Sequence, residues 1–309
     1  MSDGNTSRRV PWVAMSLSFL SAGIGHIYCG RIYKGLLLYF SWFVIPLSCF
    51  IAAFVEPSAG VLIGFVLLPV TLVMIIYLYA AFDAYEIAKR GGSDYELKDY
   101  NRAILYWLLI FVWLAYPISL IAGVREFVYE AFYLPTRSMN PSVVQGDRIL
   151  VNKLWVQKQF PERGDVVVFR NPEPTGGRVF IERVVAVAGD RIVIKGDEVE
   201  INGKRLERNR IPLESLDGIR DQIDGDPFYE SNSGKRYKVM YGDGPAAEIE
   251  TDPIDIVVPP RNVFLLGDNR DRSRDSRHFG PIHAGDIIGH VDYIFYPTGN
   301  WSRFGVYRD

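Results

Sequence analysis

Cysteine is nearly absent from this 309-residue chain, which contains only Cys29 and Cys49. Both lie in the apolar first part of the sequence, so the polar second part contains no thiol. This absence excludes an internal disulfide, a cysteine nucleophile and a thiolate-bound zinc ion from the second part. We therefore expect any catalytic device there to be built from other side chains.

An excess of basic charge is also lacking. The formal net charge is −2, and no lysine- or arginine-rich stripe stands out. Nucleic-acid-binding domains usually carry such a stripe, so we expect no nucleic-acid partner. The spacing of histidines and acids shows no metal-ligand pattern, and no internal repeat is visible. We accordingly predict neither a metal ion nor another cofactor.

Apolar and charged residues are distributed unevenly along the chain. Apolar residues crowd the first ~125 positions and charged residues crowd the remainder, a division typical of a membrane domain followed by a soluble one. Arg8 and Arg9 precede the first apolar run as in a signal peptide, but further runs follow, so we expect permanent anchors. The predicted domains are residues 1–124 and 125–309, the second with a polar insertion at about 207–251.

Three apolar segments reach the ~20 residues that a membrane-spanning helix needs: Tyr33–Val55, Ala59–Phe82 and Ile104–Val124. A fourth, Val10–Cys29, is weaker and fits either a span or a re-entrant piece. Its glycines continue to Gly35 in a pattern that resembles small two-helix membrane modules. We interpret these small residues as sites of close helix packing.

Loop charge predicts the orientation of the segments. The connection Asp83–Arg102 and the turn Arg31–Lys34 are basic, whereas the turn Glu56–Ser58 has no lysine or arginine. Basic loops stay in the cytoplasm. The last apolar segment should therefore run outward and place everything from Arg125 onward on the extracytoplasmic side of the cell membrane.

The second part of the chain is predicted to be a mostly antiparallel β domain. Short β-rich runs alternate with glycine- and asparagine-containing turns, and no long helical period appears. The segment Val199–Lys204, with Asn202-Gly203 at its centre, is typical of a hairpin. The expected strands are Arg148–Val151, Asp165–Phe169, Val179–Val187, Arg191–Ile194, Val199–Ile201, Ile254–Val258, Val263–Leu266 and Ile287–Tyr296.

One serine, Ser138, follows the last apolar segment closely and lies between Pro135 and Pro141. A serine nucleophile needs a rigid position, a base and an oxyanion hole. The prolines stiffen the backbone, and Thr136 could direct its hydroxyl at an oxyanion beside the Ser138 amide. By itself, this local pattern is far more typical of an ordinary loop serine than of a nucleophile.

The wider arrangement resembles the type I signal peptidases, membrane-bound serine–lysine proteases that remove signal peptides. The last matching block, GDNRDRSRDSRHFG at Gly267–Gly280, is the most specific. The preceding blocks occur in the family's order and are Pro135–Ser142, Gly146–Lys153, Arg163–Phe169 and Phe180–Asp190. The resemblance covers about Tyr133–Tyr296 and implies a signal-peptidase-like β fold.

The resemblance also implies roles for individual residues. Ser138 matches the nucleophile, and Thr136 matches the hydroxyl-bearing member of the oxyanion hole. The supporting positions are Ser273, which hydrogen-bonds the base, the buried ion pair of Asp275 with Arg277, the structural residues Asp268 and Asn269, and Met139 beside the nucleophile.

The position of the family's base is where this chain departs from the pattern. Bacterial members have a lysine there and eukaryotic-type members a histidine, but this chain has Glu182. Strand alternation places Glu182 on one face with Phe180 and Val184, whereas Arg183 points the other way. Arg183 therefore cannot replace the base, and a guanidinium stays protonated in any case.

Three interpretations of Glu182 remain open. The chain is catalytically silent, or a buried Glu182 with a raised pKa acts as an unusual base, or a base comes from elsewhere. The candidates for a base from elsewhere in the chain are Lys153, His278, His283 and His290. The sequence shows no pattern that links any of them to Ser138.

We therefore expect a multi-pass membrane serine endopeptidase that cleaves signal peptides from exported preproteins. The alternative is an impaired relative that binds signal peptides or a secretion partner without cleaving. The expected partners are preprotein signal peptides and the lipid bilayer, with secretion machinery as a possible third.

Overall fold

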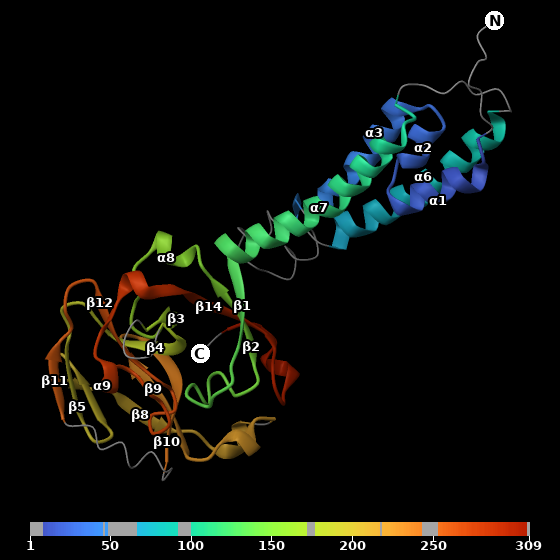
Figure 1. The fold of residues 1–309 in the computed structure, drawn as a ribbon. Coiled ribbons are helices and arrows are strands. Elements are labelled where there is room, and N and C mark those ends of the chain that lie inside the picture. The colour runs from blue at the N-terminus through green and yellow to red at the C-terminus, as the bar shows by residue number, and fades with distance from the viewer. Residues whose placement is uncertain are drawn as a thin grey trace, which may run out of the picture. The chain divides into compact units, whose positions relative to one another are not determined.

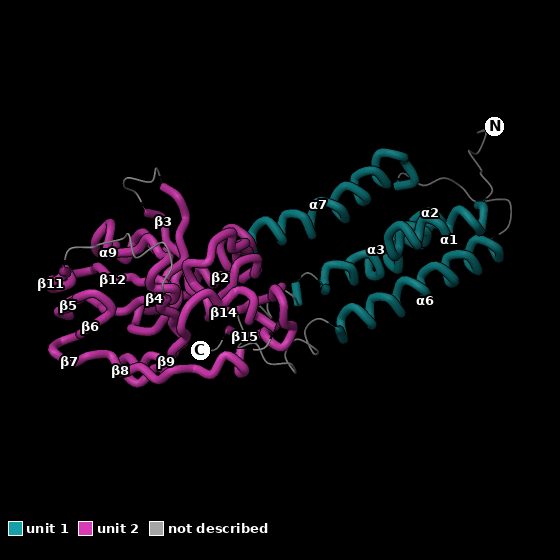
Figure 2. Tube along the Cα trace, turned by 90° about the horizontal axis from the view of Figure 1, so that it is seen from below, with its two compact units in different colours: residues 1–124 teal, residues 125–309 magenta. Residues whose placement is uncertain are grey.

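The structure, a computed structural model, describes residues 9–45, 47–48, 67–91, 100–171, 177–216, 218–242 and 253–307. The chain divides into two compact units, residues 1–124 and 125–309 (Figure 2). Each unit has its own hydrophobic core.

The first unit is helical (Figure 1). Two of its helices, of 23 and 25 residues, are long and apolar enough to cross a membrane. The helices are α1 (Pro11–Leu20), α2 (Ile24–Tyr28), α3 (Ile32–Phe40), the 3₁₀ turn η1 (Ser41–Phe43), α6 (Leu68–Arg90) and α7 (Ala103–Phe127).

Close packing of small residues joins the first helices. The weak apolar segment Val10–Cys29 is divided into α1 and α2 by a break at which Gly23 has φ +92°. A Cβ atom at Gly23 would lie 2.0 Å from the carbonyl oxygen of Gly35, and one at Gly25 would lie 2.0 Å from that of Ala14. Only glycine fits such approaches, so the packing interpretation of these glycines is confirmed.

Several sequence-based segments extend beyond the described residues. Parts of Tyr33–Val55, Ala59–Phe82 and the loop Asp83–Arg102 lie outside them, as do Cys49 and the turn Glu56–Ser58. The described part of α6 continues eight residues past Phe82, to Arg90.

The second unit is mostly antiparallel β-structure, which confirms the predicted fold class. Its main sheet has the order β1-β2-β14-β3-β4-β12-β13, with β15 paired to β14, and two smaller sheets have the orders β11-β5-β6-β7 and β10-β9-β8. The strands are β1 (Tyr129–Tyr133), β2 (Arg148–Asn152), β3 (Val166–Arg170), β4 (Val179–Val187), β5 (Arg191–Lys195), β6 (Glu198–Ile201), β7 (Lys204–Arg205), β8 (Glu207–Arg210), β9 (Asp226–Asn232), β10 (Lys235–Tyr241), β11 (Ile254–Val257), β12 (Asn262–Leu266), β13 (Ile282–His283), β14 (Ile287–Tyr296) and β15 (Gly305–Val306), with the short helices α8 (Trp155–Lys158) and α9 (Ser276–Phe279).

Each predicted strand corresponds to an observed one, and the predicted hairpin is β6–β7. Asn202 and Gly203 at its turn have φ values of +53° and +75°, the left-handed conformations that a two-residue hairpin turn requires. Apolar side chains on β2, β3 and β14 form one core cluster, and those on β4, β5, β6 and β12 contribute to another.

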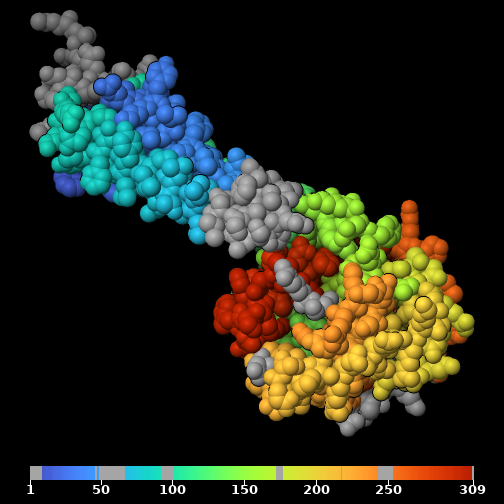
Figure 3. Space-filling view, turned by 180° about the vertical axis from the view of Figure 1, so that it is seen from behind, coloured from blue at the N-terminus to red at the C-terminus, as the bar shows by residue number. Residues whose placement is uncertain are grey.

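The polar region 207–251 is largely folded onto the unit. Its described part forms β8 and the hairpin β9–β10, and residues 243–252 lie outside the described ranges. In Figure 3 the yellow-to-orange atoms of this region form a continuous part of the visible face of the β unit. The Asn232 side chain donates to the Val185 carbonyl at 2.9 Å, which attaches β9 to the end of β4.

Candidate active site

Ser138 lies in the connection between β1 and β2, which are paired along their whole length. The connection is closed at its base by Gly146 N–H, which donates to the Leu134 carbonyl at 2.8 Å. The neighbouring side chain of Met139 is fully buried in the core cluster that contains Val151. Met139 thus anchors the turn while Ser138 stays half-buried, which is the arrangement that a positioned but accessible nucleophile requires.

Two contacts define the surroundings of Ser138. Its Oγ lies 3.3 Å from Oγ1 of Thr136, which is exposed. Its carbonyl accepts a hydrogen bond of 2.9 Å from Asn269 N–H, and the Asn269 side chain donates to the Arg137 carbonyl at 3.1 Å. The structure therefore brings Ser138, Thr136 and Asn269 together, although Asn269 is 131 positions after Ser138 in the sequence.

Glu182 is buried in the middle of β4, with 1% of its surface exposed. Its Oε1 accepts a hydrogen bond of 3.0 Å from Ser273 Oγ, whereas Oε2 is buried without a partner. Gly267 covers this pair, because a Cβ atom there would lie 2.2 Å from the Ser273 Cβ and 2.8 Å from Oε2. The predicted contact between the position of the base and Ser273 is therefore present.

The surroundings hold the pKa of the Glu182 carboxyl well above its ordinary value of 4.5. Burial is the largest cause because it removes water from the charged form, and the nearby Asp275 carboxylate adds to it. The Ser273 hydrogen bond opposes this shift, Asp268 reinforces it, and Arg277 opposes it. Glu182 can therefore hold a proton to a pH at which an exposed glutamate has lost it.

Replacement of Glu182 by glutamine is expected to raise the melting temperature of the protein at alkaline pH but not near pH 4. The folded state keeps the Glu182 proton to a higher pH than the unfolded chain does, so unfolding releases it. Stability is complete below the ordinary pKa and falls by about 1.4 kcal/mol per pH unit until the raised pKa of the folded state is passed. The neutral amide of the variant avoids this loss.

Thermal unfolding of the two proteins between pH 4 and pH 9 measures this difference. Glu198→Gln is the matched control, because the Glu198 side chain is half-exposed in an ion pair with Arg205. A constant difference in melting temperature between the wild type and Glu182→Gln at all pH values would contradict the raised pKa.

Two ion pairs brace the residues around Glu182. Asp275 is fully buried, pairs with Arg277 at 2.8 Å and accepts the Gly267 N–H at 3.0 Å. Asp268 receives two hydrogen bonds of 2.7 Å from Arg183, and both side chains are fully buried. Arg183 follows Glu182 on β4, so the opposite faces of this strand carry the carboxyl group and the guanidinium, as strand alternation predicts.

In the described part of the chain, no hydrogen bond joins the Ser138 side chain to any of the other candidate bases. The Lys153 ammonium pairs with Glu130 at 3.2 Å, and His290 pairs with Asp292 at 2.8 Å and stacks on Trp155. His283 accepts the Gly285 N–H in a local turn, and His278 lies in α9. In the same described residues, no hydrogen bond links the Ser138 hydroxyl directly to Glu182.

Sequence reasoning missed a further buried ion pair, between Arg270 and Glu230. Arg270 and Glu230 are almost completely buried and are joined by two hydrogen bonds, of 2.5 Å and 3.0 Å. Arg270 belongs to the recognised block Gly267–Gly280, but Glu230 lies in the polar region that carried no motif. A buried arginine requires an acidic partner, yet the chain offers no local signal of which acid that is.

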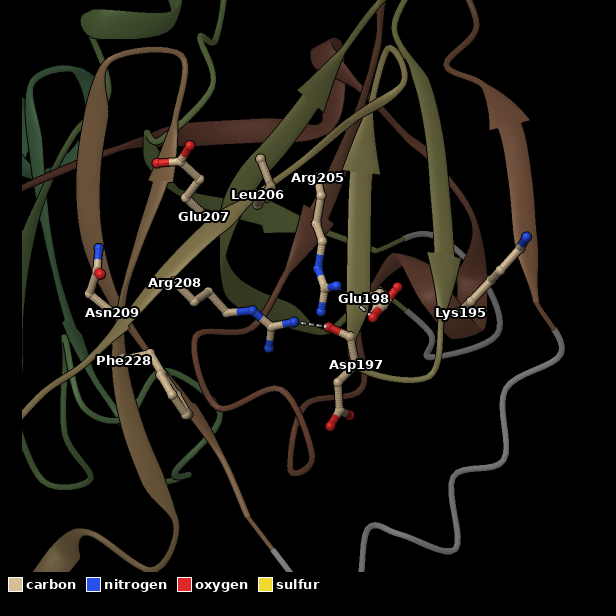
Figure 4. Close-up of a pocket in the computed structure, with 9 residues that line it drawn as sticks. All are labelled: Lys195, Asp197, Glu198, Arg205, Leu206, Glu207, Arg208, Asn209 and Phe228. Atoms are coloured by element: carbon tan, nitrogen blue, oxygen red, sulfur yellow. Dashed lines mark hydrogen bonds and ion pairs between the residues drawn. The ribbon is translucent and has the colours of Figure 1, made fainter.

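A cavity of about 880 Å³ lies apart from these residues, between β6–β7 and β8–β9 (Figure 4). Its charges are mixed, with an ion pair of 2.7 Å between Arg205 and Glu198. Arg208 donates to the Asp197 carbonyl at 2.6 Å. None of the predicted site residues lines this cavity. Among the described residues, no group of three or more histidine, cysteine or acidic side chains is placed to hold a metal ion.

Comparison with known proteins establishes the class to which this arrangement belongs. The family described as "Signal peptidase, peptidase S26" matches residues 104–296. This match covers more than half of the chain, so the chain belongs to the signal peptidase family and the predicted membership is confirmed. The family is one of peptidases.

Individual relatives match about three fifths of the chain. The chain is 32% identical over 191 residues to a probable signal peptidase I-1 of Synechocystis, a match to 59% of this chain and 79% of that protein. It is 25% identical over 191 residues to an inactive signal peptidase IA of Staphylococcus aureus strain Mu50, a match to 60% of this chain and 89% of that protein. A solved structure of a signal peptidase I from Enterococcus faecalis V583 is 25% identical to this chain. The match covers 43% of this chain and 97% of that protein's chain. Its TM-score of 0.27 is too low to bear on the fold.

Proposed function

We propose that this chain is a membrane-bound serine endopeptidase that removes N-terminal signal peptides from exported preproteins, with Ser138 as the nucleophile and Glu182 as the base. The observation that carries the proposal is the unpartnered Oε2 of Glu182. Ser273 occupies Oε1, so the carboxylate keeps one free acceptor oxygen within a dry site. Family membership supports the reaction class and the substrate class.

The chemistry follows from these positions. Glu182 in its ionised form accepts the proton of Ser138 Oγ, and Oγ then forms a bond to the carbonyl carbon of the scissile peptide. The Ser138 N–H and the Thr136 hydroxyl are proposed to donate to the oxyanion. Glu182 next protonates the leaving amine, and water hydrolyses the resulting ester. A raised pKa helps this cycle because a base works best when its pKa lies near the working pH.

Ser138 must turn its hydroxyl from Thr136 to Glu182 for the first step. The 3.3 Å contact with Thr136 is that of a resting side chain, and a serine can change rotamer readily at a half-exposed position. Catalytic hydrogen bonds frequently form only when the substrate is bound. Substrate binding is therefore proposed to complete the site.

The pH profile of cleavage tests Glu182 as the base. Cleavage of a preprotein by the full-length protein in detergent should rise with pH through the raised pKa of Glu182 and then stay level, because the carboxylate is the active form. Glu182→Lys should shift the rise to the alkaline side, and Glu182→Gln should be inactive. A wild-type profile that is flat from about pH 4 to pH 9 would exclude Glu182 as the base.

A second candidate function is binding of signal peptides or of a secretion partner without cleavage. The absence of a described hydrogen bond between Ser138 and Glu182 favours it, and the similar Staphylococcus aureus protein is named inactive. Cleavage by Glu182→Lys together with none by the wild type would select this second function. Cleavage by the wild type that depends on Ser138 would reject it.

The proposed site lies at the membrane surface, on the extracytoplasmic side. Basic residues of the loop Asp83–Arg102 support a cytoplasmic position for that loop and an outward course for α7. Only Val128 separates α7 from β1, so the nucleophile is eleven residues from the end of this helix. The exposed aromatic rings of Tyr296, Trp301 and Phe304 contact one another in series, the first pair edge-to-face and the second tilted, and they suit a membrane interface.

A further inference from the structure

A hairpin without any recognised motif, β9–β10, is bound tightly to the segment Gly267–Arg270. Met240 N–H donates to the Asp268 carbonyl at 2.7 Å, and Arg270 N–H donates to the Met240 carbonyl at 2.9 Å. These bonds form a short parallel bridge between Met240 and Asn269. The hairpin thus extends to the residue that holds the Ser138 carbonyl.

Arg270 closes this segment into a tight turn. Its Nε donates to the Gly267 carbonyl at 3.1 Å, while its Nη atoms bind the carboxylate of Glu230 on β9. Within the turn, the Asn269 N–H donates to the Ser138 carbonyl, and Gly267 at its start packs against Ser273 and the free oxygen of Glu182. The turn therefore spans the proposed nucleophile and the proposed base.

Tyr237 of β10 joins this ion pair to the one beside Glu182. Its hydroxyl donates to Oε1 of Glu230 at 3.1 Å, and its ring lies 4.1 Å from the guanidinium carbon of Arg183. Both contacts are buried, so they are strong and directional. The hairpin consequently holds both the Ser138 turn and the β4 strand that carries Glu182.

We propose that Glu230, supported by Tyr237, is a positioning residue that sets the placement of Ser138 relative to Glu182. It acts through Arg270 and the Gly267–Arg270 turn and touches neither the proposed nucleophile nor the proposed base. The expected effect of Glu230 on the cleavage rate rests on the proposed function. Its expected effect on the position of the Gly267–Arg270 turn does not.

The kinetic test compares Glu230→Gln and Tyr237→Phe with the wild type in preprotein cleavage. Both variants keep the size of the side chain, and each removes one part of the network. We expect kcat to fall on the order of tenfold to hundredfold with KM changed less than about twofold, because small misplacement of reacting groups affects the chemical step. Glu198→Gln, from the exposed pair with Arg205, should leave both constants unchanged.

Amide hydrogen exchange tests the same role without catalysis. In the Ser138→Ala background, Glu230→Gln should speed exchange of the Asn269 N–H, which donates to the residue 138 carbonyl, by about tenfold. The amide of Ile192, in the separate core cluster of β5, should exchange as before. Uniformly faster exchange, or a lower melting temperature with unchanged Asn269 exchange, would overturn the positioning role.

The two tests separate the possible failures. If neither the wild type nor Glu182→Lys cleaves a preprotein, the proposed function fails and the exchange measurement alone decides the role of Glu230. If the wild type is silent but Glu182→Lys cleaves, the kinetic comparison is made in that variant. Normal kcat in Glu230→Gln and Tyr237→Phe would overturn the proposal.

Discussion

Replacement of Ser138 by alanine is expected to lower the rate of signal-peptide cleavage by at least about 10³-fold, because the reaction loses the oxygen that attacks the peptide bond. The fold should be retained, since the Ser138 side chain is half-buried and its Oγ shares a hydrogen bond only with Thr136 among the described residues. The measurement is cleavage of a radiolabelled or fluorescent preprotein by equal amounts of each full-length protein. If the wild type is silent, the same comparison is made in Glu182→Lys.

Ser215→Ala is the matched control for this prediction. Ser215 is an exposed serine of the same unit whose hydroxyl donates to the Pro212 carbonyl in a local turn. Its removal should leave cleavage unchanged. Cleavage by Ser138→Ala within tenfold of its parent would show that another residue performs the attack, and the assignment of the nucleophile would be wrong.

Replacement of Asp268 by alanine is expected to destabilise the β unit by about 3–5 kcal/mol, because it leaves the Arg183 guanidinium buried without its counter-ion. Both side chains have no exposed surface, and Asp268 accepts two hydrogen bonds of 2.7 Å from Arg183. For a unit of this size, such a loss lowers the melting temperature by roughly 10 °C. Differential scanning calorimetry of the full-length protein in detergent measures the change.

The double variant Asp268→Leu with Arg183→Met provides the internal comparison. It removes both charges and should recover much of the stability lost in Asp268→Ala, since an apolar pair avoids the cost of burying charge. Asp255→Ala, from the exposed pair with Arg191, should have no measurable effect. Equal melting temperatures of Asp268→Ala and the wild type would show that the remaining hydrogen-bond partners of Arg183 suffice.

Strands rich in β-branched residues were predictable from local sequence. Val179–Val187 is such a run, and both its limits and the opposite directions of Glu182 and Arg183 agree with the structure. The Asn202-Gly203 turn was equally predictable, because few residue pairs adopt two successive left-handed conformations. Such features depend on neighbouring residues alone, so no tertiary information is needed to find them.

Polar strands were not predictable in the same way. The segment at Tyr129–Tyr133 reads as an alternating linker, but it becomes β1 because β2 offers it a complete pairing edge. The hairpin β9–β10 lies in a region rich in glycine and acidic residues, and buried partners elsewhere stabilise it. A strand of this kind forms only when a distant edge or an ion-pair partner is available.

The sequence by itself determined the division into apolar and polar parts, the family, the position of Ser138 and the replacement of the expected lysine by Glu182. Tertiary structure decided the environment of that carboxyl group. Ser273, which donates to it, is 91 positions away, and Asp268, which pairs with the adjacent Arg183, is 85 positions away. Solvent exclusion and charge pairing arise from contacts between distant segments, and these contacts raise the pKa of Glu182 and give Glu230 its proposed role.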